Sequence, residues 1–305
     1  MSWSPSAASS CRTSPGSGLF RLFAGLLNWV PSVVARDPHR FVNELDAAAV
    51  DRLIDRLESR AKDLVFTRLF DKYAAQLNLH PTAQVLEVGC GTGATTRALV
   101  RRKDFSGHAF GVDQCPPFVV AANKFAQEQN IADRVVFAVG DAHQLDFADA
   151  TFDAVIAHTL ISHVTDPLTV LREMVRVVRP GGIVAIFDGD YASLTYAFAD
   201  HEFGHRMDVA LATASFNNPR IMREMPRLIP ELGLTALAAW GDAVSEIGGG
   251  SYFKSFAETY LPFVIKAGLI PSEAAVGWLG AQRQAIEENA FFASCNYYTY
   301  LARRT

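Results

Sequence analysis

The chain has 305 residues, of which 50% are hydrophobic and 20% charged, and its formal net charge is −4. This composition is typical of a globular protein with one large α/β domain or two smaller ones. A mildly acidic chain gives no reason to expect a nucleic acid or an anionic membrane surface as partner. The four cysteines are scattered without paired spacing. They indicate neither a disulfide framework nor a zinc ribbon, and favour a reducing, cytoplasmic location.

The first part of the chain is predicted to lie outside the main sheet. Residues 1–18 are rich in Ser, Gly and Pro and lack acidic residues, which is typical of a disordered leader. Residues 19–80 are expected to form a helical cap, because apolar residues recur there at helical spacing, in one long helix or two. Leu19–Val34 is interpreted as an amphipathic helix, with a transit segment left open, and no stable membrane insertion is expected. Arg60 and Arg68 are candidates for binding a carboxylate, although simple coverage of the sheet is favoured.

Short apolar runs alternate with helical segments between residues 81 and 190. The predicted strands are Gln84–Val88, His108–Val112, Val135–Val139, Phe152–Ala157 and Ile183–Phe187. The predicted helices between them are Thr95–Arg102, Pro116–Gln127 and a segment from Asp166 that Pro180-Gly181-Gly182 stops. This alternation predicts an α/β fold with a parallel, doubly wound sheet, which binds ligands beyond the carboxyl ends of its strands.

Residues 191–305 are expected to complete the sheet and to carry helical inserts. The inserts are predicted at residues 191–233 and 248–289, where helical spacing dominates. Leu234–Val244 and Phe291–Leu301 are the candidates for the remaining strands, and the second of these is aromatic and β-prone.

A glycine loop follows the first predicted strand. The segment Val85–Gly93 has the sequence VLEVGCGTG, with glycines at alternate positions 89, 91 and 93. Glycine has no Cβ, so the backbone can approach a ligand closely. The helix that begins after the loop offers free N–H groups. The pattern predicts a nucleotide-like cofactor at this loop.

Polar residues also follow the next three strands. Asp113 ends the second strand, some 20 residues beyond the loop, where a carboxylate suits the two hydroxyls of a ribose. Asp141 follows the third strand and can accept a hydrogen bond from the amine of adenine. His158 follows the fourth strand, with His163 close behind. Because these strand ends meet at one edge of the sheet, they predict an adenosine-like cofactor.

Taken together and in this order, these motifs resemble those of the class I S-adenosylmethionine-dependent methyltransferases. The likeness is strongest to the small-molecule group that includes the ubiquinone and menaquinone C-methyltransferases. Besides the glycine loop, the resembling segments are Gly111–Asp113, Val139–Ala142, Phe152–Val155, Ile161–Val164 and Leu171–Gly182. The resemblance implies a Rossmann-like methyltransferase fold, a mostly parallel seven-stranded sheet with helical lid insertions, in which the last strand is antiparallel.

The resemblance implies that S-adenosylmethionine is the cofactor and gives the glycine loop its role. Gly89, Gly91 and Gly93 would border the methionine and ribose parts. Glu87 would help from beneath the loop, and Cys90 would lie beside the cofactor as a small residue.

The same resemblance implies how the adenosine part is held. Asp113 would bind the ribose hydroxyls, with Gln114 beside the adenine. Asp141 would accept from the adenine amine, while the backbone N–H of Ala142 would donate to the ring.

His158 and His163 are the candidate catalytic residues. The family places residues near the methionyl group and the substrate after the fourth strand, and an imidazole has the near-neutral pKa that suits a base. His158, closer to the strand end, is the candidate base, whereas in the wider family His163 is more often part of the cavity wall. A hydrogen-bonded residue of the wall is at least as good an interpretation of each. The predicted reaction is in-line methyl transfer to an O, C or N atom of a small, partly apolar or aromatic molecule, and no metal ion is predicted.

The N-terminal cap and the two inserts are expected to form the lid over the substrate, as such regions do in the family. Aromatic residues should supply the walls, and about half of the candidates are expected to be ordinary core. The candidates are Tyr191, Phe198, Phe203, Phe216, Tyr252, Phe253, Phe256 and Tyr260. The oligomeric state is left open, a homodimer included.

Three other interpretations compete with this one. The glycine loop followed by Ala94 also satisfies the G-x-G-x-x-A fingerprint of nicotinamide enzymes, but Glu87 and Asp141-Ala142 favour S-adenosylmethionine. A protein that binds S-adenosylmethionine without transferring methyl would have the same cofactor site. The segment His201–His205 matches H-E-x-x-H, with Glu224 as a possible third zinc ligand. Five-residue patterns arise by chance, so a histidine-lined pocket or a solvated helix face is favoured over zinc.

Overall fold

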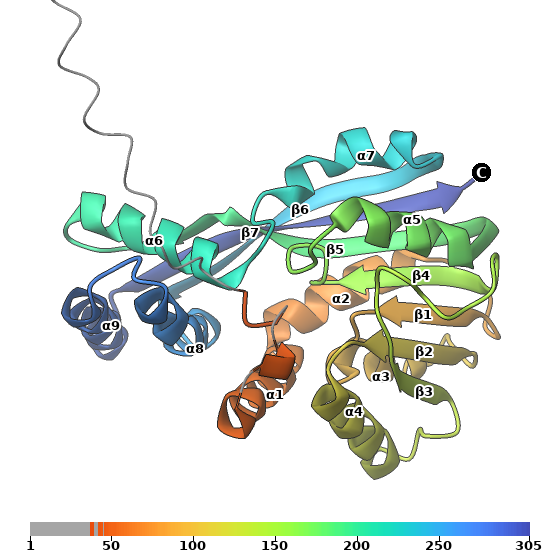
Figure 1. Ribbon diagram of the computed structural model, residues 1–305, viewed down its shortest axis with the longest axis horizontal. Helices are drawn as coiled ribbons and strands as arrows, with labels where there is room; N and C mark the ends of the chain where they lie inside the picture. Colours follow the sequence, from red (N-terminus) through yellow and green to blue (C-terminus); the bar gives the residue numbers. More distant parts are fainter. Residues whose placement is uncertain (1–36, 40–41, 45) are drawn as a thin grey trace, which may run out of the picture. The chain divides into compact units, whose positions relative to one another are not determined.

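The computed structural model describes residues 37–39, 42–44 and 46–305 (Figure 1). Its strands are β1 (Gln84–Val88), β2 (His108–Asp113), β3 (Val135–Val139), β4 (Phe152–His158), β5 (Val178–Tyr196), β6 (Leu234–Gly248) and β7 (Phe291–Arg304). They form one sheet in the order β3-β2-β1-β4-β5-β7-β6. The first five strands pair in parallel, and β7 pairs antiparallel with both β5 and β6. The predicted mostly parallel seven-stranded sheet is confirmed; the predictions for residues 1–18 and Leu19–Val34 lie outside the described residues.

Helices cover the sheet and gather at one of its ends. The described helices are η1 (Val42–Glu44), α1 (Ala47–Lys62), α2 (Leu64–Gln76), α3 (Ala94–Val100), α4 (Pro116–Glu128), α5 (Pro167–Val177), α6 (His201–Ser215), η2 (Ile221–Arg223), α7 (Met225–Glu231), α8 (Tyr252–Lys266) and α9 (Ser272–Glu287). Helices α6, α8 and α9 lie where β5, β6 and β7 extend past the other strands (Figure 1). Helix α1 contacts α3 and α4 on one side and α8 on the other, so it spans the region above the glycine loop.

The N-terminal cap contains two helices, α1 and α2, which meet at Asp63. This residue has an extended backbone (φ −66°, ψ 131°), which ends α1. Its carboxylate accepts a hydrogen bond of 2.8 Å from the backbone N–H of Val65 and thereby caps α2. Asp46 caps α1 in the same way through Ala49. The two capping aspartates therefore explain why the apolar pattern, continuous in sequence, folds as two segments.

Strand β5 is much longer than the predicted run Ile183–Phe187. It continues to Tyr196 because β7 supplies an antiparallel partner along this whole length, with a register shift between Asp190 and Thr195. Beside the shift, the guanidinium of Arg223 donates to both carboxylate oxygens of Asp190 at 2.8–3.0 Å. The first insert, predicted to be helical from residue 191, is therefore strand at its start.

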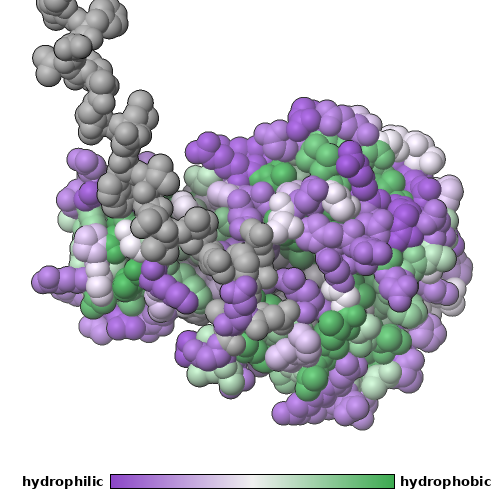
Figure 2. Space-filling view, viewed as in Figure 1, coloured by the Kyte–Doolittle hydropathy of each residue, from purple (hydrophilic) through white to green (hydrophobic). Residues whose placement is uncertain are grey.

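The buried core forms layers on both faces of the sheet. In one layer the ring of Phe187 stacks between those of Tyr73 and Tyr297, with centroid distances of 5.9 Å to Tyr73 and 5.5 Å to Tyr297. The surface seen in Figure 2 is largely hydrophilic, apart from a hydrophobic area over α4 and β3. Val120 and Val136 are exposed in these elements. Tyr73 and Phe187 also contact the ring of His158, so this layer packs against the end of β4, which carries part of the candidate site.

Substitution of Gly93 can show whether packing, as well as backbone conformation, requires a glycine in the loop. Its φ is +74°, and a Cβ added there would lie 2.5 Å from the ring of Phe137. Gly233 has nearly the same φ, +73°, with no atom within 4 Å of such a Cβ. We expect Gly93→Ala to lower the free energy of unfolding by about 2–4 kcal/mol and Gly233→Ala by about 1 kcal/mol. Urea denaturation measures both, and equal losses would contradict a packing role for Gly93.

Candidate active site

A cavity of about 380 Å³ opens at the carboxyl ends of β1, β2 and β4. This volume lies within the range of about 300–1,000 Å³ that small-molecule pockets occupy. The predicted site residues that line it are Glu87, Gly89, Cys90, Gly91, Asp113, Gln114, Asp141, Ala142, His158 and His163. Gly93 does not line the cavity: it precedes α3 and faces Phe137 instead. The cavity therefore lies where the strand pattern predicts a ligand.

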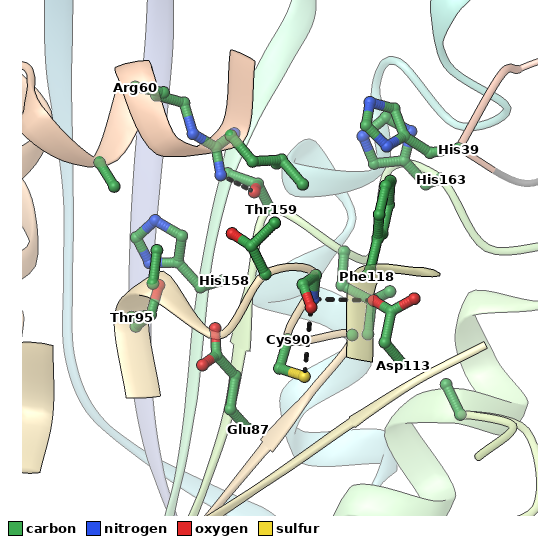
Figure 3. Close-up of a pocket in the computed structure, with 18 of the residues that line it drawn as sticks. His39, Arg60, Glu87, Cys90, Thr95, Asp113, Phe118, His158, Thr159 and His163 are labelled. Carbon is green, nitrogen blue, oxygen red and sulfur yellow. Dashed lines mark hydrogen bonds between the residues drawn. The ribbon is translucent and has the colours of Figure 1, made fainter. Parts of the chain in front are cut away.

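Asp113 holds the glycine loop in place. One of its carboxylate oxygens accepts from the backbone N–H of Gly91 at 2.8 Å, and the other accepts from Cys115 at 2.9 Å (Figure 3). The backbone N–H of Cys90 donates to the carbonyl of Val112 at 2.9 Å, which ties the loop to β2 a second time. Burial raises the pKa of Asp113. Each carboxylate oxygen can accept further hydrogen bonds, so this group can bind a diol while it holds the loop.

Glu87 is a buried carboxyl group in the cavity wall. It accepts from the backbone N–H of Thr96 at 2.8 Å and also from its hydroxyl, so it holds the start of α3. Burial raises the pKa of Glu87 to about 7. Within the described residues Glu87 has no ion-pair partner. A cationic ligand group in the cavity would therefore stabilise its charged form.

Asp141 and Gln114 lie at the open side of the cavity. The carboxylate of Asp141 is 65% exposed and accepts from the backbone N–H of His143 at 2.9 Å and from its ring at 2.8 Å. The side chain of Gln114 donates to the backbone carbonyl of His39 at 3.0 Å. Phe118 on α4, which sequence analysis misses, also lines the cavity close to Asp113 (Figure 3).

The two candidate histidines have opposite surroundings. Nδ1 of His158 lies 2.9 Å from the hydroxyl of Tyr73, and burial together with the charge of Arg60 holds the pKa of His158 well below its usual value. Nδ1 of His163 lies 2.8 Å from the carboxylate of Asp37. Burial would lower the pKa of His163, but the charge and hydrogen bond of Asp37 outweigh it and raise that pKa. His158 is therefore a neutral wall residue, whereas His163 has the environment of a proton acceptor.

His163 is held rigidly on the segment that follows β4. Asp37, whose side chain is fully buried, binds its ring. Asn217 donates to its backbone carbonyl at 2.6 Å. The buried Asp188 accepts from the N–H and the hydroxyl of Ser162, next to it in the chain. With Nδ1 bound to a carboxylate, Nε2 is the ring nitrogen left to accept a proton.

Aromatic side chains line the other half of the cavity. Of the eight predicted candidates, five line it: Tyr191, Phe216, Tyr252, Phe256 and Tyr260. Phe253 belongs to the buried core, and the half-buried Phe198 and Phe203 pack against it. The rings of Tyr191 and Phe216 lie stacked, 3.4 Å apart. The cavity is therefore polar beside the glycine loop and aromatic beneath α8.

Helix α1 forms part of the roof and is bound to the glycine loop. The carboxylate of Glu58 on α1 accepts from the hydroxyl of Thr92 and from the guanidinium of Arg97, each at 2.6 Å. Arg60 lines the cavity and donates to the hydroxyl of Thr159 at 2.8 Å, whereas Arg68 is exposed (Figure 3). Sequence analysis misses the neighbouring Arg56, since helical spacing alone does not show which arginine faces a cavity.

The H-E-x-x-H match occupies the first turn of α6, with both histidines exposed. Glu224 lies beyond the end of this helix, in the link between η2 and α7. Within the described part of the chain, no group of three or more His, Cys, Asp or Glu side chains is placed to hold a metal ion. No helix among the described residues is both long and apolar enough to cross a membrane.

Comparison with known proteins bears on this arrangement. Residues 86–186 match the family model described as a methyltransferase domain. Residues 86–186 are a class I methyltransferase domain. The cofactor of such a domain is S-adenosylmethionine, in agreement with the prediction from the glycine loop and the acidic strand ends.

Two relatives show how far the similarity extends around this methyltransferase domain. A 27-O-demethylrifamycin SV methyltransferase of Amycolatopsis mediterranei is 35% identical over 131 residues, which is 43% of this chain and 47% of the relative. An uncharacterized 37.1 kDa protein in transposon TN4556 of Streptomyces fradiae is 26% identical over 75% of this chain and 65% of the relative. The chain thus spans less than two thirds of the length of each relative.

Solved structures share the fold of the methyltransferase domain. A geranyl diphosphate methyltransferase in complex with S-adenosylmethionine superposes with a TM-score of 0.52 and 18% identity, over 90% of this chain and 97% of the other. The [4+2]-cyclase SpnF superposes with a TM-score of 0.53 and 21% identity, over 78% of this chain and 81% of the other. These likenesses confirm the Rossmann-like architecture.

The contrast between the histidines can be measured directly. We expect ring NMR signals of His163, assigned with His163→Asn, to titrate above the ordinary value of about 6.5, whereas His158 stays neutral far below it. Asp37→Asn should lower the pKa of His163, because it removes the negative charge that favours the imidazolium. Asp133→Asn, an exposed change, is the control. An unchanged pKa of His163 in Asp37→Asn would refute the pairing.

Proposed function

We propose that this protein transfers a methyl group from S-adenosylmethionine to a hydroxyl group of a small, partly aromatic molecule. The observation that carries the proposal is a single cavity that joins the glycine loop and Asp113 to an aromatic chamber containing His163. The methyltransferase domain supports the donor half, and the Asp37–His163 pair supports a hydroxyl acceptor.

The residues of the polar half fit the cofactor. Asp113 would bind the ribose hydroxyls with its remaining lone pairs, and Gly89 and Gly91 would let the backbone approach the cofactor closely. Glu87, buried without an ion pair among the described residues, would pair with a cationic group of the methionine part. These assignments keep the roles inferred from the sequence, except that Gly93 is assigned to packing against Phe137 instead of to cofactor binding.

The adenine end is assigned to the exposed side of the cavity. Asp141 would accept from the adenine amine and the N–H of Ala142 would donate to the ring, as the position of both residues in the cavity lining supports. The side chain of Gln114 lies beside them, and the ring of Phe118 would cover the adenosine.

The chain would promote the reaction mainly by orientation and by excluding water. When bound, S-adenosylmethionine supplies a methyl group activated by the sulfonium. His163 would accept the proton of the attacking hydroxyl at Nε2, and Asp37 would orient the ring and stabilise its charged form. We assign the base to His163 instead of His158, because burial holds the pKa of His158 well below its usual value and makes its ring a weak proton acceptor, whereas Asp37 raises the pKa of His163.

We further propose a cytoplasmic location and no nucleic-acid partner. The net charge of −4 supports the second point. The described cysteines Cys90, Cys115 and Cys295 are buried and free, which supports a reducing compartment.

The cofactor assignment predicts a loss of affinity in Asp113→Asn. The amide cannot accept with both of its polar atoms, so we expect binding of S-adenosylhomocysteine to weaken about 10- to 100-fold. Isothermal titration calorimetry measures this, with the exposed Asp133→Asn as the matched control. A folded Asp113→Asn protein with wild-type affinity would remove Asp113 from the cofactor site.

Methyl transfer itself is tested with methyl-labelled S-adenosylmethionine and a panel of phenols and alcohols. We expect equal amounts of S-adenosylhomocysteine and labelled product from at least one acceptor. Asp37→Asn should slow this reaction about 10²- to 10⁴-fold. It should also move the rise in rate to lower pH, because His163 then loses its proton at lower pH. Binding of S-adenosylhomocysteine without label transfer across the panel would speak against the proposed reaction.

A further inference from the structure

Arg56 is a buried cation in the aromatic half of the cavity. It lies on α1, is 8% exposed and lines the cavity. Its guanidinium carbon lies 5.0 Å from the ring centroids of Tyr252 and Phe256 and 5.3 Å from that of Tyr260. One guanidinium nitrogen donates to the hydroxyl of Ser255 at 3.2 Å. Three rings of α8 therefore fix the position of the charge.

No carboxylate among the described residues pairs with Arg56. The contrast with Arg97 is informative: Arg97 is 5% exposed and pairs with Glu58 at 2.6 Å. A buried charge is costly unless it is paired and hydrogen-bonded, and stacked rings with the neutral hydroxyls of Ser255 and Tyr260 supply only part of that compensation. The unpaired guanidinium therefore leaves the cavity with a fixed positive charge that an anion can neutralise.

The charge of Arg56 lies on the acceptor side of the cavity. It lowers the pKa of Tyr252 and Tyr260, although burial keeps both raised overall, and it contributes to the lowered pKa of His39. Arg60, one turn further along α1, also acts on Tyr252 and His39, and in addition on Glu87 and His158 beside the glycine loop. The contacts of the two arginines differ: Arg60 donates to the hydroxyl of Thr159, whereas Arg56 is packed against three rings of α8.

We propose that the methyl acceptor carries a carboxylate which Arg56 binds, attached to an aromatic body that packs against the rings lining the chamber. This inference rests on the proposed function and names the substrate class of the same site. The planar guanidinium matches a carboxylate in shape and charge, and a ring packed against the wall formed by Tyr191, Phe216 and Phe256 would bury an apolar face. An acidic group would be anchored at Arg56 while the hydroxyl is presented to His163.

The proposal is tested by binding of matched probes to the full chain in saturating S-adenosylhomocysteine. The probes are 4-hydroxybenzoate against 4-hydroxybenzyl alcohol, and 6-hydroxy-2-naphthoate against 6-hydroxymethyl-2-naphthol. We expect at least one acid to bind the wild type about tenfold or more tightly than its alcohol. Arg56→Met should abolish this preference and leave the affinity for S-adenosylhomocysteine unchanged. Arg206→Met is the control, since Arg206 is an exposed arginine 5.2 Å from the ring of Phe203.

Three results would overturn the proposal. The first is a wild-type protein that binds acid and alcohol equally, or that binds neither acid. This result can be obtained without any variant. The second is an Arg56→Met protein that keeps the preference. The third is an Arg56→Met or Arg56→Lys protein whose affinity for S-adenosylhomocysteine falls as much as its affinity for the acid, which would place Arg56 in the cofactor half. If the wild type fails to bind S-adenosylhomocysteine yet still prefers the acid, the proposed function fails while the anion site stands.

Discussion

Strand β7 pairs antiparallel with β5 on one side and β6 on the other, and the acceptor half of the site depends on this pairing. Because β7 pairs with β5 from Ile183 to Tyr196, the three strands extend beyond the parallel core and give α6, α8 and α9 a surface to pack on (Figure 1). Helix α8 then contributes aromatic side chains to the wall of the cavity. A parallel sheet alone would hold the cofactor residues but leave their outer side open.

The two halves of the cavity contain different charged side chains. Beside the glycine loop, Glu87 and Asp113 are buried carboxyl groups held mainly by N–H and hydroxyl donors. At the other end, Arg56 is a buried cation held by aromatic rings. His163 lies between them with its own carboxylate, Asp37. Arg60 offsets part of the charge of Glu87, whereas no carboxylate among the described residues pairs with Arg56. The cation at the aromatic end therefore has the charge to select a ligand of opposite sign.

Local patterns in the sequence predict the part of this molecule that local interactions determine. The apolar runs of β1 to β4, the glycine loop and Asp113 are short-range features, and the structure places them as expected. Their order along the chain also places the cavity, because parallel strands end at one edge. Gly93 shows the limit of such reasoning, since its neighbour Phe137 is distant in sequence.

The parts of the structure that the sequence does not predict depend on contacts between residues far apart in the chain. Asp37 and His163 are 126 positions apart, and no periodicity connects them. The extension of β5 depends on β7, about a hundred residues later, as the pairing of Thr195 with Ser294 illustrates. Arg56 and Arg60 occupy the same face of α1 in sequence terms, and only the packing of α8 gives them different surroundings. Helical spacing predicts a helix and its buried face, but not what lies opposite that face.

Because α1 is attached to both halves of the cavity, ligand binding in one half can affect ligand binding in the other. Glu58 ties the helix to Thr92 in the glycine loop, and two residues earlier Arg56 ties it to α8. One rigid element thus forms a boundary of both the donor and the acceptor compartments. A ligand that stabilises its seated position on one side lowers the cost of binding on the other, and thermodynamic linkage makes that benefit equal in both directions.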